Sequence, residues 1–268
     1  LVGLEGSGKT DSIRTLVEAG LKVFVVFSEP GMEVLLDSSR GRKVYTCSEG
    51  LHWRYHPVVS PSFGDLMEAA DILNRFTFKE ISDMAPMKRE KFRAFYEIMA
   101  TMANLICERC GTVFGAADHL KYDEWAVVND SLTSISKASL YGHIGTKPGV
   151  HKGEYGICMH NIERYVDKFV NDMPCMGVMM AHVDKEPNEV TGGMENMVAT
   201  LGQKLAPKIP RPFSDVILAK RDVDKFTWST TESNYRLKTR NFAFSGTILP
   251  TFKPLVEKLH SKINEEMA

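Results

Sequence analysis

Apolar positions along the chain fall into short continuous runs separated by helical patterns. Residues 22–28 (K-V-F-V-V-F-S) are β-branched and aromatic without polar alternation, which predicts a strand buried on both faces. Residues 125–129 (W-A-V-V-N) and 175–181 predict two more strands of this kind. A helix is expected at residues 9–19, and Gly20 is expected to end it. Strands that alternate with helices indicate a mostly parallel sheet.

Apolar residues spaced three and four apart predict further helices at residues 63–76, at about 87–110, around 162–169 and at 251–267. Methionine and aromatic side chains form the stripe of the second helix, and such a stripe is expected to pack in the core. Its members are Phe92, Phe95, Met99, Met102 and Ile106.

Two segments without these patterns, residues 137–156 and 184–212, are expected to be long loops. Three strand-like runs follow, at residues 215–220, 226–231 and 235–240. The expected fold class is therefore α/β, with a mostly parallel central sheet flanked by helices and with antiparallel strands near the C-terminus.

One domain is expected to span residues 1–268, with a helical insertion at about 76–110. The 268 residues and the 43% hydrophobic content support a substantial core. The formal net charge of -1 gives the whole protein no attraction to nucleic acid, so DNA binding requires local basic patches. No apolar run of about 18 residues predicts a transmembrane helix, and no membrane partner is expected. The chain begins at Leu1 without a methionine, so the lack of a visible signal peptide does not exclude a targeting segment.

Five cysteines are too few and too scattered for a disulfide framework, which favours a reducing cytoplasmic location. Cys107 and Cys110 have the spacing of half a zinc site, and Cys47 with His52 or His56 is the only source of a second half. The alternative is a pair of ordinary thiols near a helix end.

The segment G-L-E-G-S-G-K-T, at residues 3–10, matches the phosphate-binding pattern G-x-x-x-x-G-K-T. Backbone N–H groups of such a loop point at phosphate oxygens, and the following helix adds its positive end. Lys9 is expected to bridge the β- and γ-phosphates of ATP, and the hydroxyl of Thr10 to bind Mg²⁺. The expected ATP-binding residues are Gly3, Glu5, Gly6, Ser7, Gly8, Lys9, Thr10 and Asp11.

Polar residues end the three predicted parallel strands, where ligands bind in such sheets. Asp130 is expected to hold Mg²⁺ together with Thr10, although an aspartate there can instead cap the next helix. Glu29 is expected to orient or deprotonate the attacking water, or else to be a solvated turn residue. His182 is expected to contact the γ-phosphate and report it to the following loop, or else to be structural.

Lys238 and Arg240 lie two apart in a predicted strand and project from one face. Such a pair is either a solvated edge or a pair of fingers presented to the ATP of a neighbouring subunit.

In combination, these motifs resemble the RecA-like ATPase core, most closely the short phage-encoded RecA-like proteins that include the Sak-type single-strand annealing ATPases. The resemblance is carried by the phosphate loop, Glu29, V-V-N-D-S-L-T around Asp130, M-M-A-H around His182, and K-T-R-N. It implies a DNA-stimulated ATPase of recombination or annealing that forms filaments or rings. It also implies location in the host cytoplasm and a single-strand-binding protein as a further partner.

The resemblance further implies that the two expected loops hold single-stranded DNA. Cations with interleaved aromatic residues such as Tyr141 and Tyr155 suit sequence-neutral strand binding, although such charges can also be merely solvated. The expected DNA contacts are Lys137, Lys147, Lys152, Lys204, Lys208 and Arg211. A ring-helicase motor subunit, a P-loop kinase of a small molecule and a non-catalytic ATP-binding scaffold remain alternatives.

Overall fold

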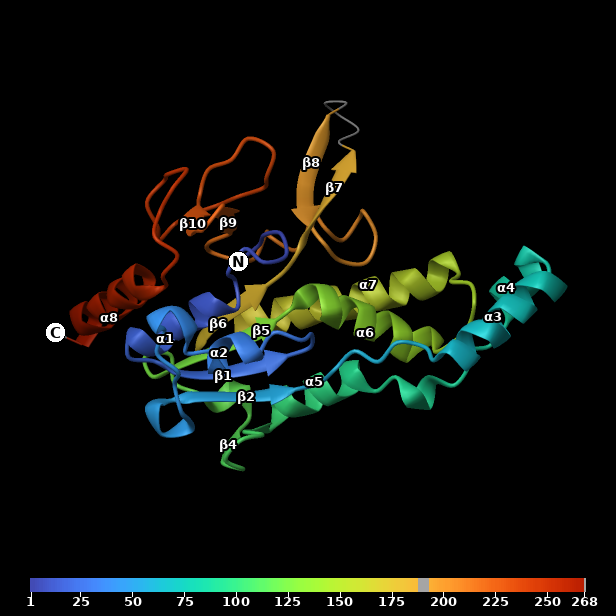
Figure 1. Ribbon diagram of the computed structural model, residues 1–268, viewed down its shortest axis with the longest axis horizontal. Coiled ribbons are helices and arrows are strands. Elements are labelled where there is room, and N and C mark those ends of the chain that lie inside the picture. The colour runs from blue at the N-terminus through green and yellow to red at the C-terminus, as the bar shows by residue number, and fades with distance from the viewer. Residues whose placement is uncertain (188–192, 268) are drawn as a thin grey trace.

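A four-stranded, wholly parallel sheet lies at the centre of the computed structural model, which describes residues 1–187 and 193–267 (Figure 1). In spatial order its strands are β2 (Leu51–Tyr55), β1 (Lys22–Phe27), β5 (Trp125–Asp130) and β6 (Met176–Met180). The expected α/β class, with a parallel central sheet flanked by helices, is confirmed.

Strand β1 is buried on both faces, as its unbroken apolar run predicts. Val23, Val25 and Phe27 pack into one hydrophobic cluster. Phe24 and Val26 belong to the cluster on the opposite face. The alternation follows from the two-residue period of a strand, and it gives the domain a core on each side of the sheet.

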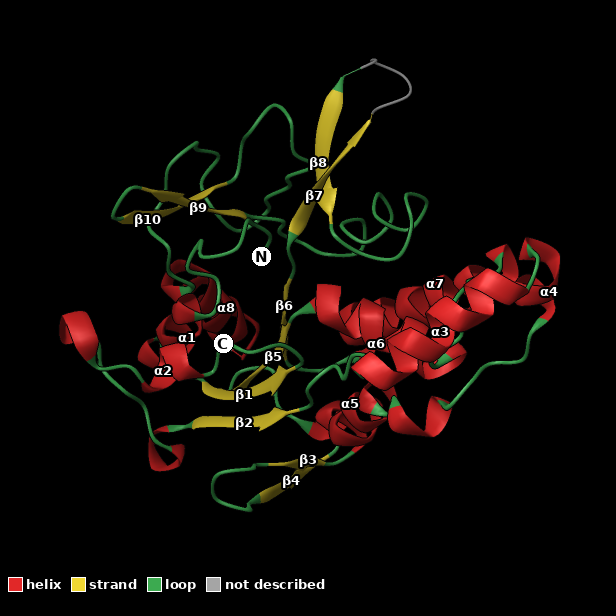
Figure 2. Cartoon of the chain, turned by 45° about the vertical axis from the view of Figure 1, so that its right-hand side comes forward, coloured by secondary structure: helices red, strands yellow, loops and turns green. Residues whose placement is uncertain are grey.

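Helices cover both faces of the sheet (Figure 2). One layer contributes Leu16, Leu35 and Val256 to the core, and its helices are α1 (Arg14–Glu18), α2 (Glu33–Leu36) and α8 (Lys253–Met267). The other layer contributes Ile98, Ile135 and Ile162, and its helices are α5 (Ala94–Ala103), α6 (Leu132–Ile144) and α7 (Lys152–Asp167).

The first residues of the chain extend the sheet beyond β6. Val2 forms parallel bridges to Ala181, which follows β6, and to Leu218 in β9 (Leu218–Asp222). Its N–H donates to the carbonyl of Ile217 over 2.9 Å. The glycine-rich loop, residues 3–10, therefore begins between β6 and β9 at the carboxyl edge of the parallel strands.

Three antiparallel hairpins accompany the sheet in the described part of the chain. Strand β9 pairs with β10 (Lys225–Ser229), and β7 (Val183–Pro187) pairs with β8 (Met194–Val198). The smallest hairpin joins β3 (Leu105–Ile106) to β4 (Val113–Gly115). The first two lie on the side where the chain begins (Figure 1).

Helices α3 (Phe63–Arg75) and α4 (Phe78–Asp83) project from the far end of the helical layer (Figure 1). Ser62 caps α3 by accepting a hydrogen bond from the N–H of Asp65. Across the described residues, none of the helices combines the length and apolar character that crossing a bilayer requires. The remaining helical turns are short: Asp11–Ile13, Ser39–Gly41, Cys47–Glu49, Arg89–Lys91, Ala117–His119 and Lys168–Asp172.

The expected long helix at 87–110 is wrong. Helix α5 covers only its middle, because Asn104 leaves the helix with an extended backbone and the chain then enters β3. Strand β2 was not predicted, since the charged Arg54 and the imidazole of His52 interrupt its apolar pattern. The strand expected at 235–240 forms only isolated bridges.

Both expected loops contain regular structure. Residues 137–156 lie mostly in α6 and α7, because buried apolar side chains continue the helical spacing on both sides of Gly145. The segment 184–212 contains the β7–β8 hairpin. Its residues 188–192 fall outside the described part of the chain.

Candidate active site

Close packing requires the glycines of the G-x-x-x-x-G-K-T loop. A Cβ on Gly3 would lie 2.5 Å from the carbonyl oxygen of Ala219, and a Cβ on Gly8 would lie 2.8 Å from the ring of Phe226. Gly6 and Gly8 also have φ angles of +68° and +84°, which side-chain-bearing residues rarely adopt. Only glycine at these positions allows the backbone to fold into a compact cradle.

Lys9 lies buried at the mouth of this cradle. Its ammonium donates to the carbonyl oxygens of Gly3 and Leu4, each over 2.9 Å. Burial lowers the pKa of Lys9, and the charges of Asp130 and Glu29 oppose that shift. A phosphate would offer this ammonium charge-assisted hydrogen bonds, which are stronger than those to neutral carbonyls.

Thr10 and Asp130 meet at the base of the loop. The hydroxyl of Thr10 donates to Oδ2 of Asp130 over 2.6 Å. Asp130 ends β5 and is 2% exposed, and burial raises its pKa to about 6 although the Thr10 hydrogen bond lowers it. Ser131, joined to Asp130 by a cis peptide bond, caps α6 through the N–H of Ser134, so the capping alternative for Asp130 does not hold.

Glu29 and His182 contact each other across two strand ends. Nε2 of His182 lies 3.0 Å from Oε1 of Glu29, and the hydroxyl of Ser134 donates to Oε2 over 2.7 Å. Burial raises the pKa of Glu29, but the hydrogen bonds from His182 and Ser134 outweigh it and hold the pKa below its usual value. Among the described residues, Nδ1 of His182 is buried without a hydrogen-bond partner.

The carboxyl edge of the sheet thus brings three of the predicted site residues together. Asp130 ends β5, and Glu29 and His182 follow β1 and β6, so the parallel strands place all three at one edge. The arrangement supplies a cation for phosphate charge, a hydroxyl and carboxylate for a metal ion, and a carboxylate that stays ionised near neutral pH.

Two further residues of this region were missed by sequence reasoning. The ring of Phe226 packs on Gly8, and the guanidinium of Arg221 lies 5.7 Å from the centre of that ring. Nη1 of Arg221 is also 3.9 Å from the Cβ position of Gly6. The β9–β10 hairpin brings both to the loop through the pairing of Leu218, and no sequence motif marks that pairing.

The remaining residues expected to bind ATP have different environments. The hydroxyl of Ser7 is buried without a hydrogen-bond partner in the described structure, whereas Glu5 is exposed. The carboxylate of Asp11 is engaged by Arg14 over 3.1 Å and by Arg42 over 3.0 Å. Asp11 therefore offers the loop its backbone N–H rather than its carboxylate.

Lys238 and Arg240 lie away from the glycine loop of their own chain. Lys238 pairs with Val216, two residues before Leu218, toward the amino ends of the parallel strands. Its ammonium donates to the carbonyl of Arg211 over 2.9 Å. The guanidinium of Arg240 is exposed and forms no ion pair with the described residues.

Two of the cations expected to contact DNA are neutralised within the protein. The expectation that Lys147 contacts DNA is wrong. Its buried ammonium binds both carboxylate oxygens of Glu154, over 3.0 and 3.1 Å, and the carbonyl of Ser82. Lys208 pairs with Glu163 over 2.8 Å. The other four expected cations are exposed: Lys137 on α6, Lys152 at the start of α7, and Lys204 and Arg211 after β8.

Comparison with models of known protein families finds no match to this chain, and comparison with curated proteins finds no matching relative. The assignment of the site therefore rests on the loop motif and on the side chains that the fold brings to it.

Proposed function

We propose that the chain binds ATP with Mg²⁺ at its glycine-rich loop and hydrolyses it. The hydrogen bond between Thr10 and Asp130 supports this most directly, because it joins the last residue of the loop to a buried carboxylate 120 residues away. Mg²⁺ takes oxygen ligands in a compact octahedral shell and is usually bound by one or two protein groups plus phosphates and water. A hydroxyl and a carboxylate 2.6 Å apart beside a phosphate cradle match that requirement.

In the proposed reaction Glu29 orients or deprotonates the attacking water. Its ionised form is favoured by the hydrogen bonds from Ser134 and His182, and an ionised carboxylate is needed to accept a proton. Lys9 neutralises charge on the β- and γ-phosphates as the bond to the leaving group breaks. The γ-phosphate competes with Glu29 for the imidazole of His182.

We propose single-stranded DNA as the partner of this ATPase and recombination or annealing as its output. His182 precedes β7 directly, and its carbonyl accepts from the N–H of Ala199 at the end of the same hairpin. Thr133 donates to the carbonyl of Ala199 over 3.0 Å. A movement of His182 would therefore be passed through these hydrogen bonds to the segment that carries the exposed Lys204 and Arg211.

The proposal also includes a neighbouring subunit. Arg240 is exposed and lies away from its own loop, so it can act only on the ATP of a second copy. An arginine supplied in trans stabilises the transition-state charge of phosphoryl transfer. ATP would then sit between subunits of a filament or ring.

Nucleotide binding is tested by titrating the purified chain with ATP in the presence of Mg²⁺ by calorimetry. Lys9→Ala should weaken binding by about 30-fold or more, since it removes a buried charge from a charged ligand. Lys22→Ala is the matched control, because Lys22 is an exposed strand lysine at the amino end of β1. Equal affinity of the Lys9→Ala protein and the wild type contradicts the proposal.

Product analysis separates the proposed function from its alternatives. Phosphate release that rises on adding single-stranded oligonucleotide supports the DNA-stimulated ATPase. Unwinding of a forked duplex identifies a helicase motor, and transfer of phosphate to a small acceptor in place of water identifies a kinase. ATP binding without any phosphate release identifies a scaffold.

A further inference from the structure

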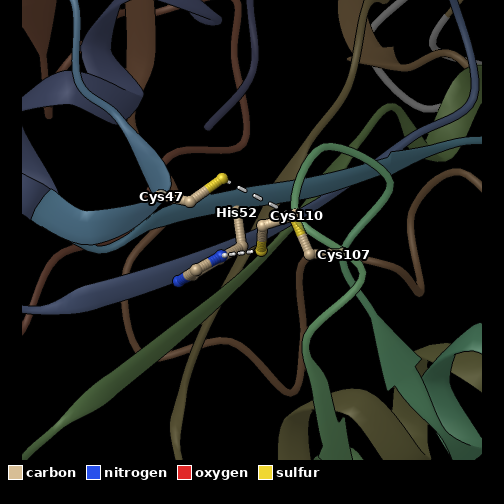
Figure 3. A group of neighbouring side chains, drawn as sticks. All are labelled: Cys47, His52, Cys107 and Cys110. Carbon is tan, nitrogen blue, oxygen red and sulfur yellow. Dashed lines mark hydrogen bonds between the residues drawn. The ribbon is translucent and has the colours of Figure 1, made fainter.

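A cluster of three thiols and one imidazole lies beside β2 (Figure 3). Its members are Cys47, His52, Cys107 and Cys110, and their ligand atoms all lie within 4.8 Å of one another. Strand β2, which carries His52, is the edge strand opposite β6. The cluster is therefore separate from the proposed ATP site.

Three segments of the chain contribute to the cluster. Cys47 begins the helical turn that precedes β2, and His52 is the second residue of β2. Cys107 and Cys110 lie in the turn between β3 and β4. Figure 3 shows all four side chains directed toward one another.

The turn between β3 and β4 brings its two thiols to the same side. The N–H of Gly111 donates to the carbonyl of Cys107 over 2.9 Å, and the N–H of Cys107 donates to the carbonyl of Thr112 over 3.0 Å. Gly111 has a φ of +71°, which allows the chain to reverse directly after Cys110. The backbone thus holds the C-x-x-C spacing in a fixed loop.

Two of the distances between the ligand atoms are close to those of tetrahedral metal coordination. Zinc–sulfur bonds of about 2.3 Å and zinc–nitrogen bonds of about 2.0 Å place tetrahedral ligand atoms about 3.5 to 3.8 Å apart. Sγ of Cys47 lies 3.8 Å from Sγ of Cys107, and Sγ of Cys110 lies 3.8 Å from Nδ1 of His52. A disulfide would need its sulfur atoms about 2.05 Å apart, so these thiols are not bonded to each other.

Neighbouring groups define which histidine takes part. Nε2 of His56 lies 2.7 Å from the hydroxyl of Thr101, and its ring is therefore engaged elsewhere. The ring of His52 packs against Phe114 at 4.6 Å and Trp125 at 6.1 Å, which fixes its orientation. This settles the choice that the sequence leaves open in favour of His52.

We propose that Cys47, His52, Cys107 and Cys110 bind one Zn²⁺ as a structural site. Each thiol would lose its proton to solvent on binding, and neutral His52 would donate the lone pair of Nδ1. Four protein ligands complete the tetrahedron, which leaves no open position for a substrate. The partly exposed Cys47 and the exposed Cys110 leave the metal a route of entry.

The proposed zinc would attach the β3–β4 hairpin to the edge of the sheet. These strands have only two and three residues, and a two-stranded hairpin of that size is not stable alone. Arg109, in the same turn, stacks on Trp53 of β2 at 4.4 Å and adds a second contact. The metal would thus connect β2 to the hairpin by bonds stronger than this stacking.

Metal analysis of the full chain, produced in zinc-containing medium, tests the proposal. Elemental analysis should find about one zinc per chain. Cys110→Ser should lower zinc affinity at least tenfold, since losing even a supporting group costs about 10- to 100-fold. Cys158→Ala is the matched control, because Cys158 is a buried cysteine outside the cluster and its loss should leave the zinc content unchanged.

A second measurement does not depend on any variant. Wild-type protein that is stripped of metal and loaded with Co²⁺ should show the intense visible absorption of tetrahedral thiolate-bound cobalt. Purified wild type without zinc and without this spectrum overturns the proposal, as does an equal loss of zinc in the Cys158→Ala control. Iron in place of zinc also overturns it.

Discussion

The hydroxyl of Thr10 donates a 2.6 Å hydrogen bond to Oδ2 of Asp130, which is 2% exposed at the end of β5. The contact joins the glycine loop to the middle of the sheet and brings two side-chain oxygen atoms to one point. The same burial that positions Asp130 also disfavours its charge. A cation bound there would reverse that effect, because it stabilises the carboxylate.

Asp130→Asn should impair the use of Mg²⁺ more than the binding of the nucleotide. The amide keeps the shape of the side chain but loses the negative charge, so the Mg²⁺ concentration for half-maximal phosphate release should rise at least about tenfold. A magnesium titration of the hydrolysis rate measures it. Asp123→Asn, in the exposed segment before β5, is the control and should behave as the wild type. An unchanged magnesium requirement in Asp130→Asn would remove Asp130 from the site.

The same substitution should stabilise the nucleotide-free protein at neutral pH. Burial raises the folded-state pKa of Asp130 to about 6, while an unfolded aspartate titrates near about 3.9. The folded state then binds the proton more tightly, so the free energy of unfolding falls as pH rises from about 4 to about 6. Asp130→Asn abolishes this loss, worth about 1 to 3 kcal/mol at pH 7.5.

Thermal unfolding without nucleotide or Mg²⁺ measures this effect. The melting temperature of Asp130→Asn should exceed that of the wild type at pH 7.5, and the difference should vanish near pH 4. A variant that is less stable than the wild type at pH 7.5 would contradict the prediction, because the ionised carboxylate would then stabilise the fold.

Glu29→Gln should bind ATP normally and hydrolyse it about 100-fold or more slowly, because general-base catalysis contributes about that much. The amide oxygen can still accept from one of the two partners, and the amide N–H can donate to the hydroxyl oxygen of Ser134, so the local structure should persist. Single-turnover phosphate release, together with the dissociation constant of ATP, separates chemistry from binding. Glu33→Gln, which alters the first residue of α2, is the control. A parallel loss of affinity and rate would assign Glu29 to binding.

Arg240 should act only across a subunit boundary. Asp215 accepts hydrogen bonds from the N–H groups of Arg240 and Asn241 and from the side chain of Asn241, which fixes the segment while the guanidinium stays exposed. Arg240→Ala should lower the hydrolysis rate about 1000-fold without weakening ATP binding. Arg236→Ala is the control on the same segment, since Arg236 pairs with Glu195.

Mixing two inactive variants tests the shared site. Arg240→Ala subunits keep an intact glycine loop, and Lys9→Ala subunits keep the arginine, so mixed assemblies should contain some complete sites. Partial recovery of phosphate release on mixing supports action in trans. No recovery, with mixed assemblies shown to form by light scattering, contradicts it.

The parallel core was predictable because burial on both faces leaves a continuous apolar signature. Residues 22–28 and 125–129 have this signature and became β1 and β5. Strand β2 lacks it, since His52 turns to a thiol cluster and Arg54 lies at the edge. An edge strand that carries polar site residues lacks the continuous apolar run of a buried strand. Only its tertiary contacts then identify it as a strand.

The strand-end residues were predictable for a related reason. Polar residues at the ends of buried parallel strands must meet at one edge, and Glu29 and His182 do meet there. The DNA-binding cations were harder to predict, because the charge of a residue does not indicate where the residue lies in the fold. Lys147 looked like a loop cation in the sequence, but helix α7 places Glu154 against it in the interior. Phe226 gave no signal, because its role depends on the pairing of β9 with Val2.

The contact between Gly8 and Phe226 leads to a test of the loop itself. Gly8 and Gly20 both have positive φ angles, +84° and +96°, so an alanine at either position pays a similar conformational cost. Only at Gly8 does the added Cβ meet a neighbour, the ring of Phe226 at 2.8 Å, whereas nothing lies within 4 Å at Gly20. Comparing the two variants therefore isolates the effect of moving the glycine loop away from the ring of Phe226.

Gly8→Ala should weaken ATP binding by about tenfold or more, since overpacking of this kind costs about 1 to 3 kcal/mol and must shift the backbone that faces the phosphates. Gly20→Ala should lower the melting temperature but leave the dissociation constant unchanged. Phe226→Leu combined with Gly8→Ala should restore part of the affinity, because the smaller side chain makes room for the methyl group. If Gly20→Ala weakens ATP binding as much as Gly8→Ala, general destabilisation rather than the geometry of the loop controls affinity.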